Sequence, residues 1–341
     1  MKGIFFGIAM LLLGVLIFSI TIIDVGIGNI ADAFRTISVV YVFAFVILSL
    51  VLQAIAVFRW KLILKVLEYK IGFLDLFQYN IIGFAISYIT PVGRIGGAPA
   101  RMFLLKRHNV PIEKGLASVL LDNIIENSID IVFAIILISL FFLKIPVQIP
   151  SGPIEIPKQW EFAVIGGSAI ILAVLAIFYY RMLTGKGVFF TLLKITRISR
   201  FPMFAWSEKK LHELDNTFSW FIRTRYKELI AIFIISCITW VILLMQYKIA
   251  LLSLGQEMKI FQLLIVMGVL AATGVAPVPA GLGVLEFGQA GIFYLLGLDP
   301  RIGIAFALLV RLRDFFLTSL GSLFLLQIGL GNLAQDYGKK P

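Results

Sequence analysis

The chain has 341 residues, of which 60% are hydrophobic and 14% charged, and its mean hydropathy is +1.00. Ordinary soluble domains do not have this composition, so the sequence predicts an integral membrane protein. The net charge of +11 does not indicate a nucleic-acid partner, because a multi-pass chain gathers Lys and Arg on its cytoplasmic side and near anionic lipids.

The predicted elements are apolar helices separated by short polar stretches. Full spans are expected over residues 4–23, 38–58, 116–143, 161–180, 229–252 and 302–328. The first lacks a small-residue cleavage site and is interpreted as a retained helix rather than a signal peptide. Residues 181–228 are basic and interleaved with aromatic residues, which is typical of an amphipathic segment lying on a membrane surface.

Two proline-glycine breaks interrupt the apolar sequence, at residues 90–101 (TPVGRIGGAPAR) and 276–286 (APVPAGLGVLE). Proline removes a backbone donor and glycine relaxes the backbone, so each break should interrupt a helix. Interrupted backbone at membrane depth is tolerated only where protein or a watery cavity surrounds it. Each break therefore predicts a re-entrant hairpin and a working site. The expected hairpin arms are 74–89 and 99–105, then 260–276 and 284–296.

The distribution of basic residues predicts the topology. With both broken segments re-entrant, 20 of the 30 Lys and Arg residues fall in cytoplasmic stretches and 5 fall outside. The cytoplasmic set includes a basic stretch directly after the second span, made of Arg59, Lys61, Lys65 and Lys70. This bias predicts a cytoplasmic (plasma) membrane protein with six full spans, two re-entrant hairpins and both termini in the cytoplasm.

The two halves of the chain match each other. Each half contains, in order, two full spans, a broken hairpin and a third full span. The first half starts on the cytoplasmic side of the membrane, and the second half starts on the opposite side. Asp122 lies 31 residues after Pro91, and Arg311 lies 32 residues after Pro279. We expect an all-α polytopic fold with an inverted repeat and a site where the breaks meet, although chance similarity between apolar halves is the alternative. The predicted parts are a first repeat (1–143), an extracytoplasmic loop (144–160), a second repeat (161–328) including the basic cytoplasmic segment 181–228, and a cytoplasmic tail (329–341).

The first break contains a candidate anion site. Arg94 and Arg101 flank Gly96 and Gly97, whose backbone N–H groups are expected near a helix N-terminus. Guanidinium groups and a helix N-terminus can supply donors to the same phosphate oxygens. The alternative is that these arginines only extend to the cytoplasmic interface.

Three carboxylates, Asp122, Glu126 and Asp130, repeat at i, i+4 and i+8 along one predicted span. Carboxylates on one helix face are costly in hydrocarbon, so they should face the bundle interior, water or cations. Asp122 is close enough to the helix start to reach the cytoplasmic interface. Glu126 and Asp130 are deeper and are the better candidates for proton uptake or for binding a cationic headgroup.

The second break supplies the remaining site candidates, Gly281, Gly283, Glu286 and Arg311. Glu286 follows the break directly, at a helix start where the dipole favours a carboxylate in any case. The structural alternative is that Arg311 or Arg313 pairs with Glu126 or Glu286 only to hold the protein together.

Cofactor chemistry has little support. With one cysteine, Cys237, and two histidines, His108 and His212, the chain offers no Cys/His metal set. It has no phosphate-cradling nucleotide loop and no nucleophile-base-acid set. We therefore predict no metal, no cofactor and no enzymatic activity.

The residues of both breaks, TPVGRIGG with Arg101 and PVPAGLGVLE with Arg311, resemble the transmembrane region of the lysylphosphatidylglycerol synthases, a family of flippase-like proteins. The resemblance covers nearly the whole chain. An acidic residue often follows the first Gly-Gly in that family, where this sequence has Ala98 and Pro99. In the full-length synthases a soluble domain transfers lysine to phosphatidylglycerol and the membrane part flips the product. The resemblance implies translocation without that transfer, because this sequence contains no such domain.

Together these observations predict a translocator of a phospholipid or polyprenyl-phosphate-linked lipid. Arg94 and Arg101 are expected to engage the phosphate, and Glu126 and Glu286 a headgroup amine or a coupling proton. The expected partners are membrane lipids and a lipid-modifying glycosyltransferase or synthase. The alternatives are the membrane subunit of a lipid-linked glycosyl- or aminoacyl-transfer system, a non-transporting scaffold, and a small-solute transporter.

Overall fold

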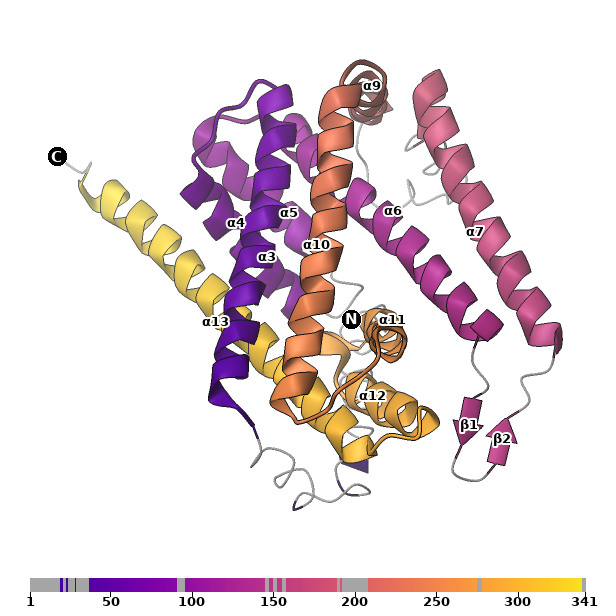
Figure 1. The fold of residues 1–341 in the computed structure, drawn as a ribbon. Coiled ribbons are helices and arrows are strands. Elements are labelled where there is room, and N and C mark those ends of the chain that lie inside the picture. The colour runs from indigo at the N-terminus through magenta and orange to yellow at the C-terminus, as the bar shows by residue number, and fades with distance from the viewer. Residues whose placement is uncertain are drawn as a thin grey trace, which may run out of the picture.

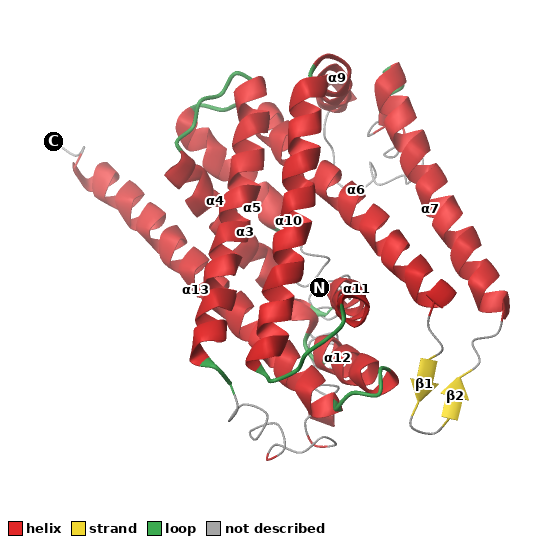
Figure 2. Ribbon diagram, in the orientation of Figure 1, coloured by secondary structure: helices red, strands yellow, loops and turns green. Residues whose placement is uncertain are grey.

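The computed structural model describes residues 19–20, 23, 28, 37–90, 96–144, 147–149, 152–154, 158–188, 191, 208–274 and 278–338. These residues form helices, apart from one short hairpin (Figure 2). The helices are α3 (Val39–Val66), α4 (Phe73–Ile89), α5 (Gly97–Leu105), η1 (Lys106–His108), α6 (Ile112–Lys144), α7 (Lys158–Thr184), α9 (Glu208–Thr224), α10 (Tyr226–Ser253), α11 (Ile260–Gly274), η4 (Pro279–Gly281), α12 (Val284–Leu295) and α13 (Pro300–Gly338). The predicted first span, 4–23, lies almost wholly outside the described residues.

Several of the helices can cross a bilayer. In the described part of the chain, α3, residues Ile165–Thr184 of α7, and α10 are long and apolar enough to do so. Many large apolar side chains on these helices are exposed, for example Phe43 and Val241. Exposed apolar side chains on long helices are expected where lipid replaces water as the surrounding medium. The chain is therefore a multi-pass helical membrane protein.

Helices from the two halves of the chain pack closely against each other. α3 and α10 lie side by side along their length (Figure 1), and α4 packs against α3, α5 and α13. α12 packs between α11 and α13, while α6 contacts α3, α5, α7, α9, α10 and α11. Apolar side chains such as Trp60, Phe218 and Phe306 are buried between these helices. α6 thus touches helices from both halves of the chain, and this places its polar face in the interior.

Helix boundaries differ from the predicted ones in informative ways. α3 does not end at residue 58 but continues to Val66, because Lys61 and Lys65 are good helix formers and the first left-handed residue is Glu68, with φ 71°. α5 starts at Gly97, before the predicted arm, because Pro99 falls in the first turn, where its missing N–H is not needed.

One short hairpin and the extension of the last helix were not predicted. Strands β1 (Val147–Ile149) and β2 (Gly152–Ile154) pair antiparallel within the expected loop 144–160. α13 runs to Gly338, well past the expected end of the last span at 328.

In the basic segment 181–228, the structure describes α9, whose Leu214, Phe218 and Phe221 are buried against its neighbours. One face of α9 is therefore apolar, as the aromatic pattern predicted.

Candidate substrate cavity

A polar cavity lies inside this helical assembly. Its volume is about 740 Å³, and its lining comes from α3, α4, α5, α6, α10 and α13. A second cavity of about 380 Å³ adjoins it beside α11 and η4. Asp130, Trp240, Tyr247 and Arg313 line both cavities. Polar side chains are thus concentrated in two adjoining cavities of a largely apolar protein.

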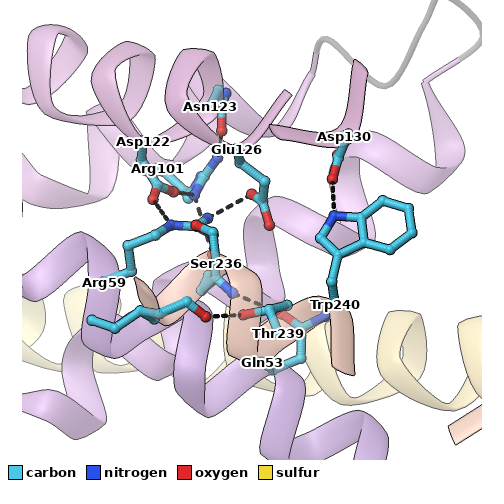
Figure 3. Close-up of polar contacts among 12 residues, drawn as sticks. Gln53, Arg59, Arg101, Asp122, Asn123, Glu126, Asp130, Ser236, Thr239 and Trp240 are labelled. Atoms are coloured by element: carbon cyan, nitrogen blue, oxygen red, sulfur yellow. Dashed lines mark hydrogen bonds and ion pairs between the residues drawn. The ribbon is translucent and has the colours of Figure 1, made fainter. Parts of the chain in front are cut away.

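Arg59 is at the centre of the larger cavity's charges and is wholly buried. Its Nε donates to Asp122 Oδ1 at 2.7 Å, and its Nη2 donates to Glu126 Oε2 at 2.6 Å. Its Nη1 reaches Ser236 Oγ at 3.2 Å, which ties α3 to α6 and α10 (Figure 3). A buried charge needs partners of this kind. Arg59 is the first residue of the predicted basic stretch after the second span, but α3 continues past residue 58 and Arg59 is buried inside the protein.

Arg101 reaches the same carboxylate from α5. Its Nη1 donates to Asn80 Oδ1 at 3.2 Å and to Asp122 Oδ2 at 3.3 Å, and its Nη2 donates to Asn123 Oδ1 at 2.7 Å. The guanidinium lies 5.3 Å from the centre of the Trp60 ring, a cation–π distance. Asp122 therefore bridges two arginines. We call Arg59, Arg101, Asp122 and Glu126 the cavity cluster.

Asp130 lies two turns further along α6 and is held differently. Trp240 Nε1 donates to its Oδ1 at 2.9 Å, and the Trp240 ring stacks on Phe133 with centroids 4.6 Å apart. Across the described residues Asp130 forms no ion pair. Of the predicted site residues, the structure thus brings Gly97, Arg101, Glu126 and Asp130 to one cavity. Arg94 lies outside the described residues.

The two predicted glycines of the first break serve close packing. The Gly97 N–H donates to Ser87 Oγ at 3.0 Å, and a Cβ on Gly97 would lie 2.4 Å from the carbonyl oxygen of Gly83. A Cβ on Gly96 would lie 2.3 Å from Thr90 Oγ1. Only residues without a side chain allow α5 to start this close to α4, which brings Arg101 within reach of Asn80.

The second break forms a separate, closed arrangement. Glu286 is wholly buried, accepts from the Gly283 N–H at 2.9 Å, and forms an ion pair with Arg311. Arg311 also donates to the carbonyl oxygens of Ala280 at 3.2 Å and Gly281 at 3.0 Å. Gly281 and Gly283 have φ values of 63° and 76°, which side-chain-bearing residues rarely adopt. We call Glu286 and Arg311 the buried pair.

The buried pair confirms the structural alternative in which Arg311 bonds to Glu286. Gly281 lines the smaller cavity, but Gly283, Glu286 and Arg311 are absent from the described lining of both. The expected joint site of Glu126 and Glu286 is therefore not assembled in this structure.

Sequence reasoning missed several residues of the cavity, among them Arg59, Trp240 and Gln246. The signal available in the sequence was the helical spacing of polar residues within two apolar spans. Ser49, Gln53, Ala56 and Arg59 follow one face of α3, and Ser236, Thr239, Trp240, Leu243 and Gln246 follow one face of α10. Both faces carry polar residues inside apolar helices.

Comparison with known proteins identifies the family. The model of the lysylphosphatidylglycerol synthase transmembrane region matches residues 4–321. The chain belongs to this family. A UPF0104 membrane protein of Pyrococcus horikoshii is 26% identical over 302 residues, which cover 83% of this chain and 87% of that protein. A UPF0104 membrane protein of Methanothermobacter thermautotrophicus is 24% identical over 325 residues, 92% of each chain. The predicted family is thereby confirmed.

Proposed function

We propose that this member of the family moves a lipid with a phosphate-containing headgroup between the two leaflets of the cytoplasmic membrane. The observation that carries the proposal is the cavity of about 740 Å³, lined by charged and amide side chains within a largely apolar protein. A polar headgroup cannot cross hydrocarbon without such a path. Binding cavities for small ligands have volumes of about 300–1,000 Å³, which accommodates a headgroup.

Helix packing supports an inverted repeat as the basis of this movement. α4 of the first half packs on α13 of the second, and α11 of the second half packs on α6 of the first. These two contacts are equivalent if α4 corresponds to α11 and α6 to α13, and α3 then pairs with its counterpart α10. In our proposal α4–α5 and α11–α12 are the two re-entrant hairpins beside six full spans, and both termini are cytoplasmic. Inverted repeats commonly open alternately to the two sides of a membrane.

Arg101 is the residue we assign to the lipid phosphate, together with Arg94. The Arg101 side chain is 11% exposed and lines the cavity, and its hydrogen bonds to the described residues use its two terminal nitrogens. Two of its acceptors, Asn80 and Asn123, are neutral, so Arg101 can exchange their amide oxygens for a phosphate oxygen at modest cost. In this proposal the chain performs no chemistry, and a lipid-modifying glycosyltransferase or synthase supplies or consumes its lipid.

A leaflet-exchange assay tests the proposal. Proteoliposomes containing NBD-labelled phospholipid or labelled polyprenyl phosphate are treated with dithionite, which bleaches only the outer leaflet unless lipid exchanges. We expect wild-type protein to expose the inner label, and Arg101→Gln and Glu126→Gln to slow exchange about tenfold, equivalent to about 1.4 kcal/mol. Arg225→Gln and Glu228→Gln are matched controls, because this pair lies on the surface and is 3.7 Å apart.

Each result has a defined meaning. Exchange lost in the cavity variants and kept in the controls supports translocation through the cavity. Exchange that Arg101→Gln and Glu126→Gln leave intact contradicts the assigned path and favours a scaffold. Absence of exchange with every lipid, with and without a proton gradient, replaces the proposal by the membrane-subunit alternative.

A further inference from the structure

The charges around the two cavities do not balance. Among the described lining residues the acids are Asp122, Glu126, Asp130 and Asp314, and the bases are Arg59, Arg101 and Arg313. Arg59 and Arg101 neutralise Asp122 and Glu126, and Arg313 donates to Asp314 at 2.7 Å and to Tyr247 at 3.2 Å. The one lining carboxylate in this described set without a basic partner is that of Asp130.

Asp130 is held by a donor that suits either protonation state. Its contact with Trp240 uses the indole N–H, and an indole N–H can only donate. A carboxylate accepts this bond, and so does the carbonyl oxygen of a protonated carboxyl group. Asp130 can therefore gain or lose a proton without losing the bond that positions it, whereas protonation of Asp122 or Glu126 would remove one of the two charge partners of Arg59.

The position of Asp130 gives it access from two directions. It lines both the larger cavity, which extends to α3 and α5, and the smaller one, which extends to α11 and η4. The two cavities meet at residues of α4, α6, α10 and α13. A group at such a junction can receive a proton from water in one cavity and release it to water in the other.

The surrounding groups leave this role to Asp130. Glu126 on α6, Arg59 on α3 and Arg101 on α5 belong to the cavity cluster. α11 carries no titratable residue between Ile260 and Gly274. Other titratable groups line the smaller cavity: Tyr88 on α4, Tyr247 on α10, and Arg313 and Asp314 on α13. Two more lie on helices packed against α6 and have hydrogen-bond partners of their own. Tyr179 on α7 donates to Ser128, and Asp215 on α9 accepts from the Val188 N–H.

A metal ion is a poor alternative occupant of this place. Among the described residues no group of three His, Cys, Asp or Glu side chains is arranged to hold one. A proton needs only one carboxylate, whereas Ca²⁺ and Mg²⁺ need several oxygen ligands.

We infer that Asp130 is the proton-binding group that couples headgroup movement to the proton gradient. Asp130 takes up one proton from the cavity open to the acidic side, and the neutral carboxyl releases it after the protein opens to the other side. The charged carboxylate is costly at membrane depth, so proton uptake and reorientation are linked. The coupling rests on the proposed function, but proton binding by Asp130 does not.

Infrared difference spectroscopy tests proton binding without any transport. Protein reconstituted in lipid is shifted between acidic and alkaline buffer, and the C=O stretch of protonated carboxyl groups is recorded. We expect wild type to show a band that Asp130→Asn lacks. Asp299→Asn is the matched control, because it makes the same change at an exposed carboxylate that accepts from the Arg301 N–H, and it should keep the band. A band that persists unchanged in Asp130→Asn overturns the inference.

A second measurement tests coupling. In proteoliposomes with an imposed pH difference, wild type should accumulate the labelled lipid in one leaflet, and the accumulation should collapse when an ionophore removes the gradient. Asp130→Asn should show no gradient-dependent accumulation. Wild type that exchanges lipid to the same distribution with and without the gradient overturns coupling. If wild type exchanges no lipid, the proposed function fails and coupling fails with it, while the infrared band still decides proton binding.

Discussion

The cavity cluster and the buried pair are built from the same chemical parts and differ in what surrounds them. Each joins a short helix that follows a break to the long helix after it, through Arg101–Asp122 in the first half and Glu286–Arg311 in the second. In the first, the arginine shares its donors among neutral amides that line a cavity. In the second, the arginine binds backbone carbonyls of the break itself.

This difference indicates a division of roles between the two breaks. Hydrogen bonds from Arg101 to side-chain amides can be exchanged for bonds to a ligand, because these amides are neutral and line the cavity. Bonds to the backbone at Ala280 and Gly281, together with complete burial of Glu286, fix the conformation of the second break. One Arg–carboxylate pair is thus placed to meet a substrate, and the other to hold a turn.

The largest expected effect breaks the buried pair. Glu286→Ala leaves Arg311 with a desolvated charge and removes the acceptor of the Gly283 N–H, and we expect a loss of about 3–5 kcal/mol in stability. The measurement is thermal unfolding of the purified protein in detergent. Glu228→Ala, which removes a partly exposed carboxylate, should change the midpoint little. An unchanged midpoint for Glu286→Ala would show that the pair does not hold the break.

A smaller effect tests the packing that positions the cavity cluster. Gly97→Ala forces a Cβ towards the Gly83 carbonyl oxygen, and we expect a loss of about 1–3 kcal/mol together with slower lipid exchange. Gly291→Ala is the matched control. A Cβ at this position meets nothing within 4 Å, and the substitution replaces a glycine in the interior of a helix. That control should be neutral or stabilising by about 0.5–1 kcal/mol. Equal thermal midpoints for the two variants would contradict the close approach of α5 to α4.

The smallest effect sharpens the contrast between Asp130 and the ion-paired carboxylates. Trp240→Phe keeps a ring to stack on Phe133 but removes the N–H donor, and it should cost about 0.5–1.5 kcal/mol in stability. It should also change the pH at which the Asp130 infrared band appears, because this carboxyl group then lacks the indole N–H that donates to it. Trp220→Phe on the partly exposed face of α9 serves as control. If the band appears at the same pH in Trp240→Phe as in wild type, Trp240 does not influence proton binding by Asp130.

The sequence was most informative where local rules decide the outcome. Pro99 with the glycines of the first break predicted an interrupted helix, and α4 and α5 are the result. The i, i+4, i+8 spacing of Asp122, Glu126 and Asp130 predicted one polar helix face, and all three line the larger cavity. These features depend on residues a few positions apart, so they can be read without knowing the fold.

Tertiary structure decided which charges meet, because electrostatic pairing depends on helices that are distant in sequence. Arg59 and Asp122 are 63 positions apart, and no local pattern assigns them to each other. The sequence by itself determined an apolar helical chain with two breaks and a set of buried charges that needed partners. Only the packing of α3, α5, α6 and α10 placed some of these charges around a cavity. The same packing left Asp130 without a basic partner among the described residues, while α12 and α13 enclosed Glu286 with Arg311.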